Sequence, residues 1–455
     1  MSTLNQIAFS GVRAAQVALS TTGQNIANVN TPGFSRLDTV MRSLAGQGGL
    51  SVGGGVEVTS IRRLSNDFQN QQLWRATTEQ NYYSNSQQYL TALEGLMAGE
   101  GSSISVGLDR FFAALSEASA TPGSVALRQQ IISETRNLSQ RFNGLNSNID
   151  AQVGALHEQR TAMATEINGL TENIALLNKK IVEAQSIGGD TAALRDHRES
   201  LVNDLSQYAS LRINEVPDGS LSVALANGQP LVAGGTSGRL QISVTPTGEQ
   251  QVALSFAGTS FPLKQNGFGG AFGGLYDVEY NNLRPAQEAL HDMAGEMARM
   301  INDTLATGFD LNGNPGQALV TYNPASTTAM LTINDLTPEE LALSSVAGET
   351  GNNEVLLALL QLKGQTITVG GSQVTLNDAY AGMLGQVASA SRQNQADLKS
   401  ATAVVQQAQA QRDSVSAVSL DEEAVNLMTY QQAYEANMKV ISTANQLFDE
   451  MLAAF

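Results

Sequence analysis

From Leu420 to Phe455 the chain repeats apolar side chains every seven positions, the spacing of a helix that packs along a partner helix. A second row follows four residues after each member of the first. The first row is Leu420, Leu427, Tyr434, Ile441, Phe448 and Phe455, and the second is Ala424, Gln431, Met438, Asn445 and Leu452. Ser419 with Glu422 predicts a capping box at the start. An amphipathic helix docked on the chain's own core is the alternative.

Near the N-terminus, small and apolar residues recur at alternating spacings of three and four. They are Leu4, Ile7, Gly11, Ala14, Ala18 and Thr21. The small side chains would let another backbone approach closely. Asn28, Asn30, Pro32 and Gly33 end this predicted helix, because the residue before a proline disfavours helical angles and glycine suits a reversal. We therefore expect the two ends to pair with each other, with copies of themselves, or with both.

Long helices are also predicted between the two ends. Residues 65–97 form the first, and a second carries Leu108, Phe111 and Leu115 before a Thr-Pro-Gly stop. The longest, 124–187, has an apolar residue every seven positions and would measure about 95 Å at about 1.5 Å per residue. The members of that row are Phe142, Ile149, Leu156, Met163, Leu170, Leu177 and Ala184. A lone helix of this length is unstable, so other long helices should lie beside it.

The pattern changes to alternating strands at about residue 210. Pro217-Asp218-Gly219 marks a hairpin, strands follow at 239–245 and 251–263, and a glycine cluster ends the β region at Gly274. Helix returns at 276–306, a strand-containing piece spans 318–346, and helices follow at 353–362 and from 376 to about 412.

We expect a mainly α, elongated, multidomain fold with a β insert in a long antiparallel, coiled-coil-like bundle. The predicted inner assembly domain joins 1–34 with 415–455. The bundle joins 35–209, 276–317 and 347–414. The outer β domain joins 210–275 with 318–346.

Composition excludes several classes of protein. Lysine and arginine total 25 against 42 acidic residues, a net charge of −17, and no local basic stripe offsets it, so no nucleic-acid partner is expected. Cysteine is absent, which removes disulfides and thiolate metal sites. No stretch approaches the roughly 20 apolar residues of a membrane span, and the first twenty residues do not read as a secretory signal peptide.

Each candidate catalytic or ligand motif fails on its context. Gly49–Gly53 matches G-x-S-x-G, but more glycines and a strand follow where a helix is required. Asp310, Asn312 and Asn314 begin like a calcium loop that then lacks its glycine and its glutamate. The three histidines, His157, His197 and His291, have no second ligand at helical spacing. The sequence predicts no enzyme, no metal and no cofactor.

Two terminal segments carry a resemblance to a known family. The first is Asn25-Ile26-Ala27-Asn28-Val29-Asn30-Thr31-Pro32-Gly33-Phe34, continued by Gly53–Val58 and Ile61–Arg63, and the second runs from Ser419 to Ile441. They resemble the signatures shared by bacterial flagellar rod, hook and hook-associated proteins. Within that family, the long heptad helix, the segment from Pro217 to Val232 and the loop 308–316 favour the hook-associated members.

The resemblance implies a structural adaptor at the hook–filament junction, outside the cell, exported by the flagellar type III apparatus without a cleaved signal. It implies a ring of copies, hook protein on one side, a second junction protein or flagellin on the other, and an export chaperone at the C-terminal helix. Neither a nucleic acid nor a membrane is a partner. The predicted partner-binding residues are Leu4, Ile7, Gly11, Ala14, Ala18, Asn25, Asn28, Asn30, Pro32, Gly33, Phe34, Leu420, Leu427, Gln431, Tyr434, Met438, Ile441, Asn445, Phe448 and Leu452.

Two alternatives remain at this point. One is another axial protein, the hook or the distal rod, which would share the terminal signatures without needing the long heptad helix. The other is a secreted binding protein or enzyme that uses the β insert.

Overall fold

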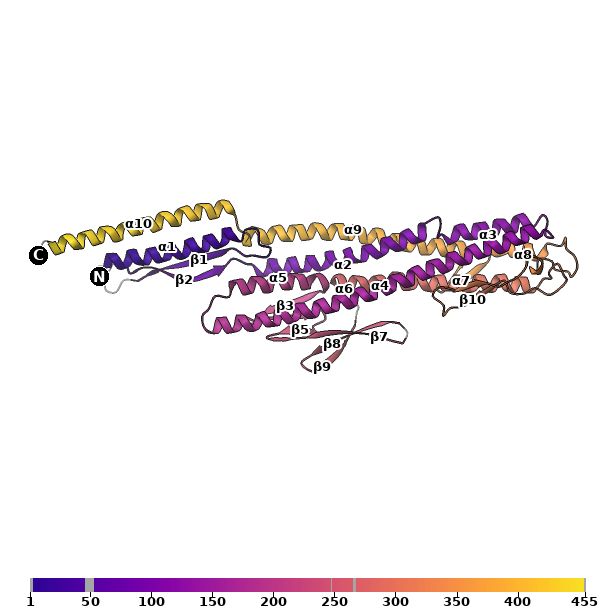
Figure 1. Cartoon of the computed structure of the whole chain (residues 1–455), viewed down its shortest axis with the longest axis horizontal. Helices are drawn as coiled ribbons and strands as arrows, with labels where there is room; N and C mark the ends of the chain where they lie inside the picture. The colour runs from indigo at the N-terminus through magenta and orange to yellow at the C-terminus, as the bar shows by residue number, and fades with distance from the viewer. Residues whose placement is uncertain (1–2, 46–52, 247, 265–266, 454–455) are drawn as a thin grey trace.

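The computed structural model describes residues 3–45, 53–246, 248–264 and 267–453, and it is strongly elongated, with both chain ends at the same end (Figure 1). Its helices are α1 (Thr3–Ala27), α2 (Asp67–Ala98), α3 (Ile104–Ala118), α4 (Val125–Ser186), α5 (Ala192–Tyr208), α6 (Gly270–Val278), α7 (Arg284–Ala306), α8 (Glu354–Gln361), α9 (Leu376–Ser416) and α10 (Leu420–Ala453), with a π-helical turn at Glu279–Leu283. Its strands are β1 (Leu37–Leu44), β2 (Gly55–Arg63), β3 (Leu211–Glu215), β4 (Leu221–Leu225), β5 (Pro230–Ala233), β6 (Thr236–Ser237), β7 (Arg239–Val244), β8 (Gln250–Phe256), β9 (Thr259–Leu263), β10 (Val320–Tyr322), β11 (Leu331–Ile333), β12 (Thr366–Val369) and β13 (Ser372–Thr375).

The two terminal helices form one module with the first hairpin. Helix α1 packs antiparallel against α10, and the β1–β2 hairpin covers another side of α1 (Figure 1). The segment 35–63, which the sequence analysis assigned to the long-helix bundle, packs in this structure on α1. Alternation alone shows that these residues form strands, but it does not show which helix they cover.

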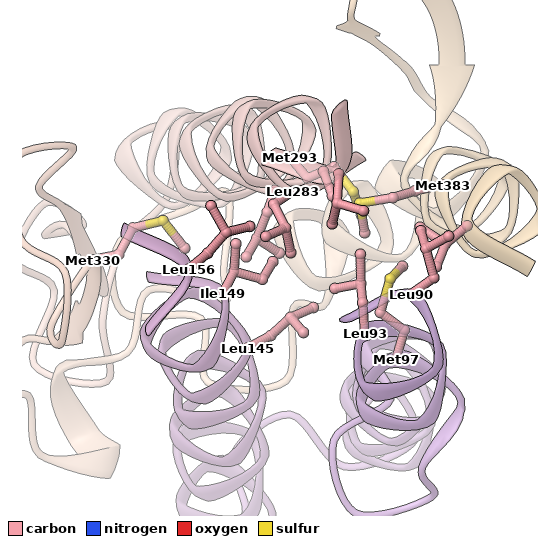
Figure 2. Packing of buried hydrophobic residues seen from close by; sticks show 14 of the residues in the cluster. Leu90, Leu93, Met97, Leu145, Ile149, Leu156, Leu283, Met293, Met330 and Met383 are labelled. Atoms are coloured by element: carbon pink, nitrogen blue, oxygen red, sulfur yellow. The ribbon is translucent and has the colours of Figure 1, made fainter. Parts of the chain in front are cut away.

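The bundle is built around α4, whose predicted heptad row is confirmed as its buried face. Ser124 caps this helix by accepting a hydrogen bond from the Leu127 N–H, and it runs unbroken for 62 residues. From Phe142 to Leu177 every seventh residue is buried. Figure 2 shows side chains of α2, α4, α7 and α9 meeting in this core, among them Leu90, Leu93, Met97, Leu145, Ile149, Leu156, Met293 and Met383. The apolar period thus explains how a helix of this length is stabilised.

The β residues form separate sheets instead of one outer domain. Strands β3–β6 and β7–β9 make a four-stranded and a three-stranded sheet beside α4. Strands β10 and β11 pair only with each other and pack on α7 and α4 near the opposite end from the chain termini (Figure 1). The sequence analysis joined 318–346 to 210–275 in one outer domain, and in the structure each piece covers a different stretch of helix.

Three asparagines on α4, one buried and two half-buried, attach the strands to the bundle. Each amide donates to a strand carbonyl and accepts from the N–H of the same residue, as a neighbouring strand would. Asn143 pairs in this way with Leu331, Asn168 with Leu240, and Asn178 with Leu221. These bonds satisfy strand edges that would otherwise be buried without partners.

Replacing Asn178 by alanine is expected to lower the free energy of unfolding by about 2–3 kcal/mol, because buried backbone groups lose their partners. Asn178 is fully buried and also bonds the Gly234 carbonyl and the Arg198 guanidinium. Urea unfolding measures the loss. Asn148→Ala is the control on the same helix, since that amide is exposed and bonds only the Gly144 carbonyl. Equal losses in the two variants would show that the amide pairing contributes little.

Candidate assembly surface of the terminal helices

The seam between α1 and α10 uses a row of α10 that differs from the predicted one. Glu423 and Ala444 are buried, and Tyr430 and Asn437 between them are half-buried, so this row of every seventh residue faces α1. A Cβ atom added to Gly11 would lie 2.5 Å from the Asn437 Oδ1 atom. The backbones can approach this closely because α1 carries no side chain at that crossing.

The predicted rows lie beside this contact face. Tyr434 and Ile441 are half-buried, and the Asn445 side chain accepts a hydrogen bond from Asn5 Nδ2 at 3.1 Å. Gln431, Ala424 and five large apolar members remain exposed, the last being Leu420 (53%), Leu427 (38%), Met438 (43%), Phe448 (55%) and Leu452 (61%). Phe455 lies outside the described residues. The chain therefore leaves most of these side chains available, and their packing between subunits stays a prediction.

Helix α10 carries exposed apolar side chains on both flanks of the face that α1 covers, and its opposite side is mostly polar. At about 100° per residue, exposed Val425 and Met428 lie roughly opposite the contact face, and Val440 and Leu447 lie on its second flank. Exposed apolar patches rimmed by polar residues are typical of surfaces that bind another protein. None of the described helices combines the length and apolarity that crossing a membrane requires.

Helix α1, with its predicted residues, packs between α10 and the β1–β2 hairpin. Ala14 and Ala18 are buried, Ile7 and Gly11 are half-buried, and Leu4 is exposed. On the hairpin side, Ser10 Oγ accepts a hydrogen bond from the N–H of Val56. A helix with small residues suits this position, since the hairpin and α10 can both approach its axis.

The signature loop after α1 forms the joint to the bundle. Buried Asn25 accepts from the N–H of Leu37 and donates to its carbonyl, both at 2.9 Å. Gly33 adopts a φ of +80°, which favours glycine, and its carbonyl accepts from Arg412 of α9. Of the remaining predicted residues, Asn28 and Phe34 are half-buried and Asn30 and Pro32 are exposed. Within one chain, these residues shape a turn.

The predicted capping box at the start of α10 is only half formed. Ser419 Oγ accepts from the N–H of Glu422 at 3.4 Å, as expected. The carboxylate of Glu422 instead forms an ion pair with Arg36 in the loop after α1. The ion pair between Arg36 and Glu422, which are nearly four hundred residues apart in sequence, therefore replaces the second hydrogen bond of the capping box. Helix α2, predicted to begin at residue 65, is capped by Asn66, whose side chain accepts from the N–H groups of Phe68 and Gln69.

The isolated candidates for chemistry have structural partners. Asp310 accepts hydrogen bonds from the N–H groups of Asn312 and Asn314, which makes a turn. His291 bonds Asn146, and His157 bonds Glu279. Residues 49–52 of the G-x-S-x-G match lie outside the described part of the chain. Within that part, no three acidic or histidine side chains are grouped as metal ligands.

A buried charge cluster at the π-helical turn was not predicted. The Glu279 carboxylate is fully buried and contacts Arg160, also fully buried, together with His157 and Arg284. Burial opposes ionisation of Glu279, but the hydrogen bonds and charges of His157, Arg160 and Arg284 outweigh it and hold its pKa below the ordinary value. The cluster ties α4 to the turn between α6 and α7.

Comparison with known proteins gives matches along the whole chain. Residues 90–320 match the family model described as "Flagellar hook-associated protein FlgK helical domain". Residues 6–34 match "Flagella basal body rod protein", and residues 409–454 match "Flagellar basal body rod FlgEFG protein C-terminal".

Similar curated proteins and one solved structure agree with these matches. Flagellar hook-associated protein 1 of Escherichia coli K12 is 26% identical, covering 99% of this chain and 100% of its own length. The protein of the same name from Bacillus subtilis 168 is 22% identical, with 96% and 95% covered. The solved flagellar hook junction protein FlgK from Burkholderia pseudomallei superposes with a TM-score of 0.67 at 18% identity, over 76% of this chain and 99% of that one. At this identity, the structural match supports the fold.

Proposed function

The chain belongs to the family of the flagellar hook-associated protein FlgK, and from this premise we propose that it is a non-catalytic structural subunit joining hook to filament. The observation that carries the proposal is α10, whose exposed apolar side chains flank the one face that α1 covers. Exposed apolar flanks of this kind are removed from water when neighbouring copies cover them. A ring of subunits supplies these neighbours.

The partners follow from the same surface. Copies of this chain pack through α1 and α10, hook protein lies on one side of the ring, and a second junction protein or flagellin lies on the other. An export chaperone covers the exposed apolar side chains of α10 before assembly, and the type III apparatus of the flagellum exports the subunit. The rod-type family models match only the two ends, whereas the hook-associated model covers much of the bundle, which favours the junction over hook or rod.

The position on the flagellum tests this function directly. Because the chain has no cysteine, a single cysteine at exposed Ser243 on β7 gives one specific site for a gold label. Electron microscopy of intact flagella should show one band where hook meets filament. Label along the whole hook, below it, or nowhere on the flagellum contradicts the proposal.

Replacing Leu427 and Met438 together by aspartate is expected to abolish incorporation into flagella. Both side chains are exposed beside the α1 contact face, so the free subunit should keep its fold. Burying two unpaired carboxylates between subunits is far too costly for assembly. Incorporation is measured by the label, and folding by circular dichroism.

The matched control is Gln432→Asp with Ser442→Asp, which adds the same charge at exposed positions of α10. Control incorporation should be close to that of the wild type. If the Leu427 and Met438 double variant incorporates equally well, the predicted seam residues do not carry the packing between subunits.

A further inference from the structure

A protein chain can modify itself where asparagine precedes glycine. The backbone nitrogen of the glycine can attack the side-chain amide of the asparagine, and glycine places no Cβ atom in the way. Four asparagines of the described residues precede a glycine, at 143–144, 168–169, 227–228 and 312–313. The asparagine of a further pair, Asn266, lies outside the described residues. Whether a pair reacts in the folded chain depends on how its two groups are held.

The two pairs in α4 are held away from reaction. Asn143 bonds Leu331 through both atoms of its amide, and Asn168 bonds Leu240 in the same way, at distances of 2.7–2.9 Å. The attacking nitrogens belong to glycines inside an unbroken helix, where backbone N–H groups are bonded to carbonyls of the preceding turn. Attack therefore requires the helix and its contact with a strand to open together.

The pair at 312–313 is exposed, but it lies in a closely bonded loop. The carboxylate of buried Asp310 accepts from the N–H groups of Asn312 and Asn314 at 2.8 and 2.7 Å. The Asp310 carbonyl accepts from the N–H of Gly313 at 3.2 Å. Bringing the Asn312 side chain onto the Gly313 nitrogen disturbs these bonds, so we expect this pair to react slowly.

The side chain of Asn227, in the turn between β4 and β5, is arranged in a way that favours attack. Asn227 and Gly228 are both exposed, and Gly228 has a φ of +91°. The Oδ1 atom of Asn227 accepts a hydrogen bond from the N–H of Gln229 at 3.3 Å. A donor at this place stabilises the negative charge that develops on the oxygen during attack. Among the described residues, the Nδ2 group of Asn227 has no hydrogen-bond partner that would hold the leaving amide.

The attacking nitrogen of Gly228 is held by the bond that closes the turn. Its N–H donates to the Leu225 carbonyl at 2.8 Å. Because the turn is exposed, water can take the place of this bond when the turn opens. Opening an exposed turn costs much less free energy than opening a core helix. A small local motion therefore releases the Gly228 nitrogen beside a side chain that is ready to react.

We propose that, among the described asparagines, Asn227 is the site at which the folded chain deamidates spontaneously. The Gly228 nitrogen gives up its proton to the solvent and bonds to the Asn227 Cγ atom, while Nδ2 gains a proton and leaves as ammonia. The product is a cyclic succinimide. Water then opens the ring at either carbonyl, which gives aspartate or isoaspartate. The whole reaction consumes water, releases ammonia and needs no oxidant, reductant or enzyme.

The two products have different effects on the turn. Aspartate keeps the acceptor for the Gln229 N–H and adds a negative charge. Isoaspartate routes the main chain through the side chain and lengthens it by a methylene, which disturbs the bond from the Leu225 N–H to the Gln229 carbonyl. Strand β5 follows directly, and its Leu231 and Val232 are buried. The turn thus accumulates an irreversible change with age at the edge of a buried core, whatever the function of the chain.

Peptide mass spectrometry of the full-length chain tests the proposal. The folded protein is incubated at mildly alkaline pH and digested, and each asparagine is scored by the mass gain of deamidation and by the separately eluting isoaspartyl peptide. Asn227 should react at least about tenfold faster than Asn143 and Asn168, because those two require a core helix to open. Asn312 should react at an intermediate rate.

The same chain unfolded in guanidinium chloride is the matched control. All four asparagines should react there at similar rates, since each precedes glycine and none is held. Asn227→Gln should remove the signal from its peptide, which confirms the assignment. The proposal is overturned if Asn227 in the folded chain reacts no faster than Asn143 and Asn168, or if Asn312 matches it. Equal rankings in the folded and unfolded chains also overturn it, because the fold would then select no site.

Discussion

Replacing Glu279 by alanine is expected to lower the free energy of unfolding of the bundle by about 3–5 kcal/mol, because removing one partner leaves a buried charge uncompensated. Arg160 and Glu279 are both fully buried, and Arg284 depends on the same carboxylate. Urea unfolding followed by circular dichroism measures the loss. Glu296→Ala is the control, since its pair with Arg299 is largely exposed and should contribute less than about 1 kcal/mol. If both variants lose a similarly small amount of unfolding free energy, the buried cluster does not contribute strongly to the stability of the bundle.

The same variant has a defined dependence on pH. The folded-state pKa of Glu279 lies below its ordinary value, so the stabilisation is complete above the unfolded-state pKa of about 4.3 and is lost as pH falls through the folded-state pKa. The difference in stability between wild type and Glu279→Ala should therefore be flat from pH 7 to about 5 and shrink below about 4. A difference that grows as the pH falls would contradict this assignment.

Replacing Gly11 by leucine is expected to separate α1 from α10 and to abolish incorporation into flagella. The first added atom would already lie 2.7 Å from the Asn437 Cγ atom, and the Asn437 amide is itself held by the Ala433 carbonyl. Alanine could be accommodated by turning the Asn437 side chain, but a leucine must push the helices apart. Amide exchange in α1 and α10 should rise to that of unprotected chain, with the bundle unaffected.

Gly23→Leu on the same helix is the control. No atom lies within 4 Å of the position that its Cβ would take, so the same substitution there should leave exchange and incorporation close to wild type. Protection of α1 and α10 in Gly11→Leu equal to that in Gly23→Leu would show that close approach at Gly11 is not required.

The long periodic helices could be predicted from the sequence, and the choice of contact face on α10 could not. In α4 one stripe alone is apolar, so the period of seven identifies both the helix and its buried side. In α10 exposed apolar residues lie on both flanks of the contact face and, at Val425 and Met428, also opposite it. Regular spacing alone therefore favours the row of large apolar residues as the contact face. In the structure the small and polar residues Ala444 and Asn437 pack against α1 instead. Regular spacing identifies a seam only when the other faces are polar.

The glycine cluster at 267–274 illustrates a different limit. Glycine disfavours helix, so these residues were assigned to the end of the β region, yet α6 begins at Gly270. A Cβ atom on Gly274 would lie 2.4 Å from the Tyr82 carbonyl oxygen of α2, so close helix packing outweighs the intrinsic preference. Neither this contact nor the pairing of Arg160 with Glu279 leaves a local signal, because each joins residues over a hundred positions apart.

Since α1 and α10 lie at opposite ends of the sequence, the order in which the chain emerges decides when the module can form. The hydrogen bond between Asn5 and Asn445 closes a loop of 440 residues. The bundle also contains contacts between residues closer in sequence, and these can form first. Closing so long a loop carries a large entropy cost until the bundle has folded and shortened it. Helix α1 therefore has no partner helix to pack against until the last turns of α10 have emerged. The surface that we propose to join copies is therefore completed last, so that an unfinished chain would not polymerise early.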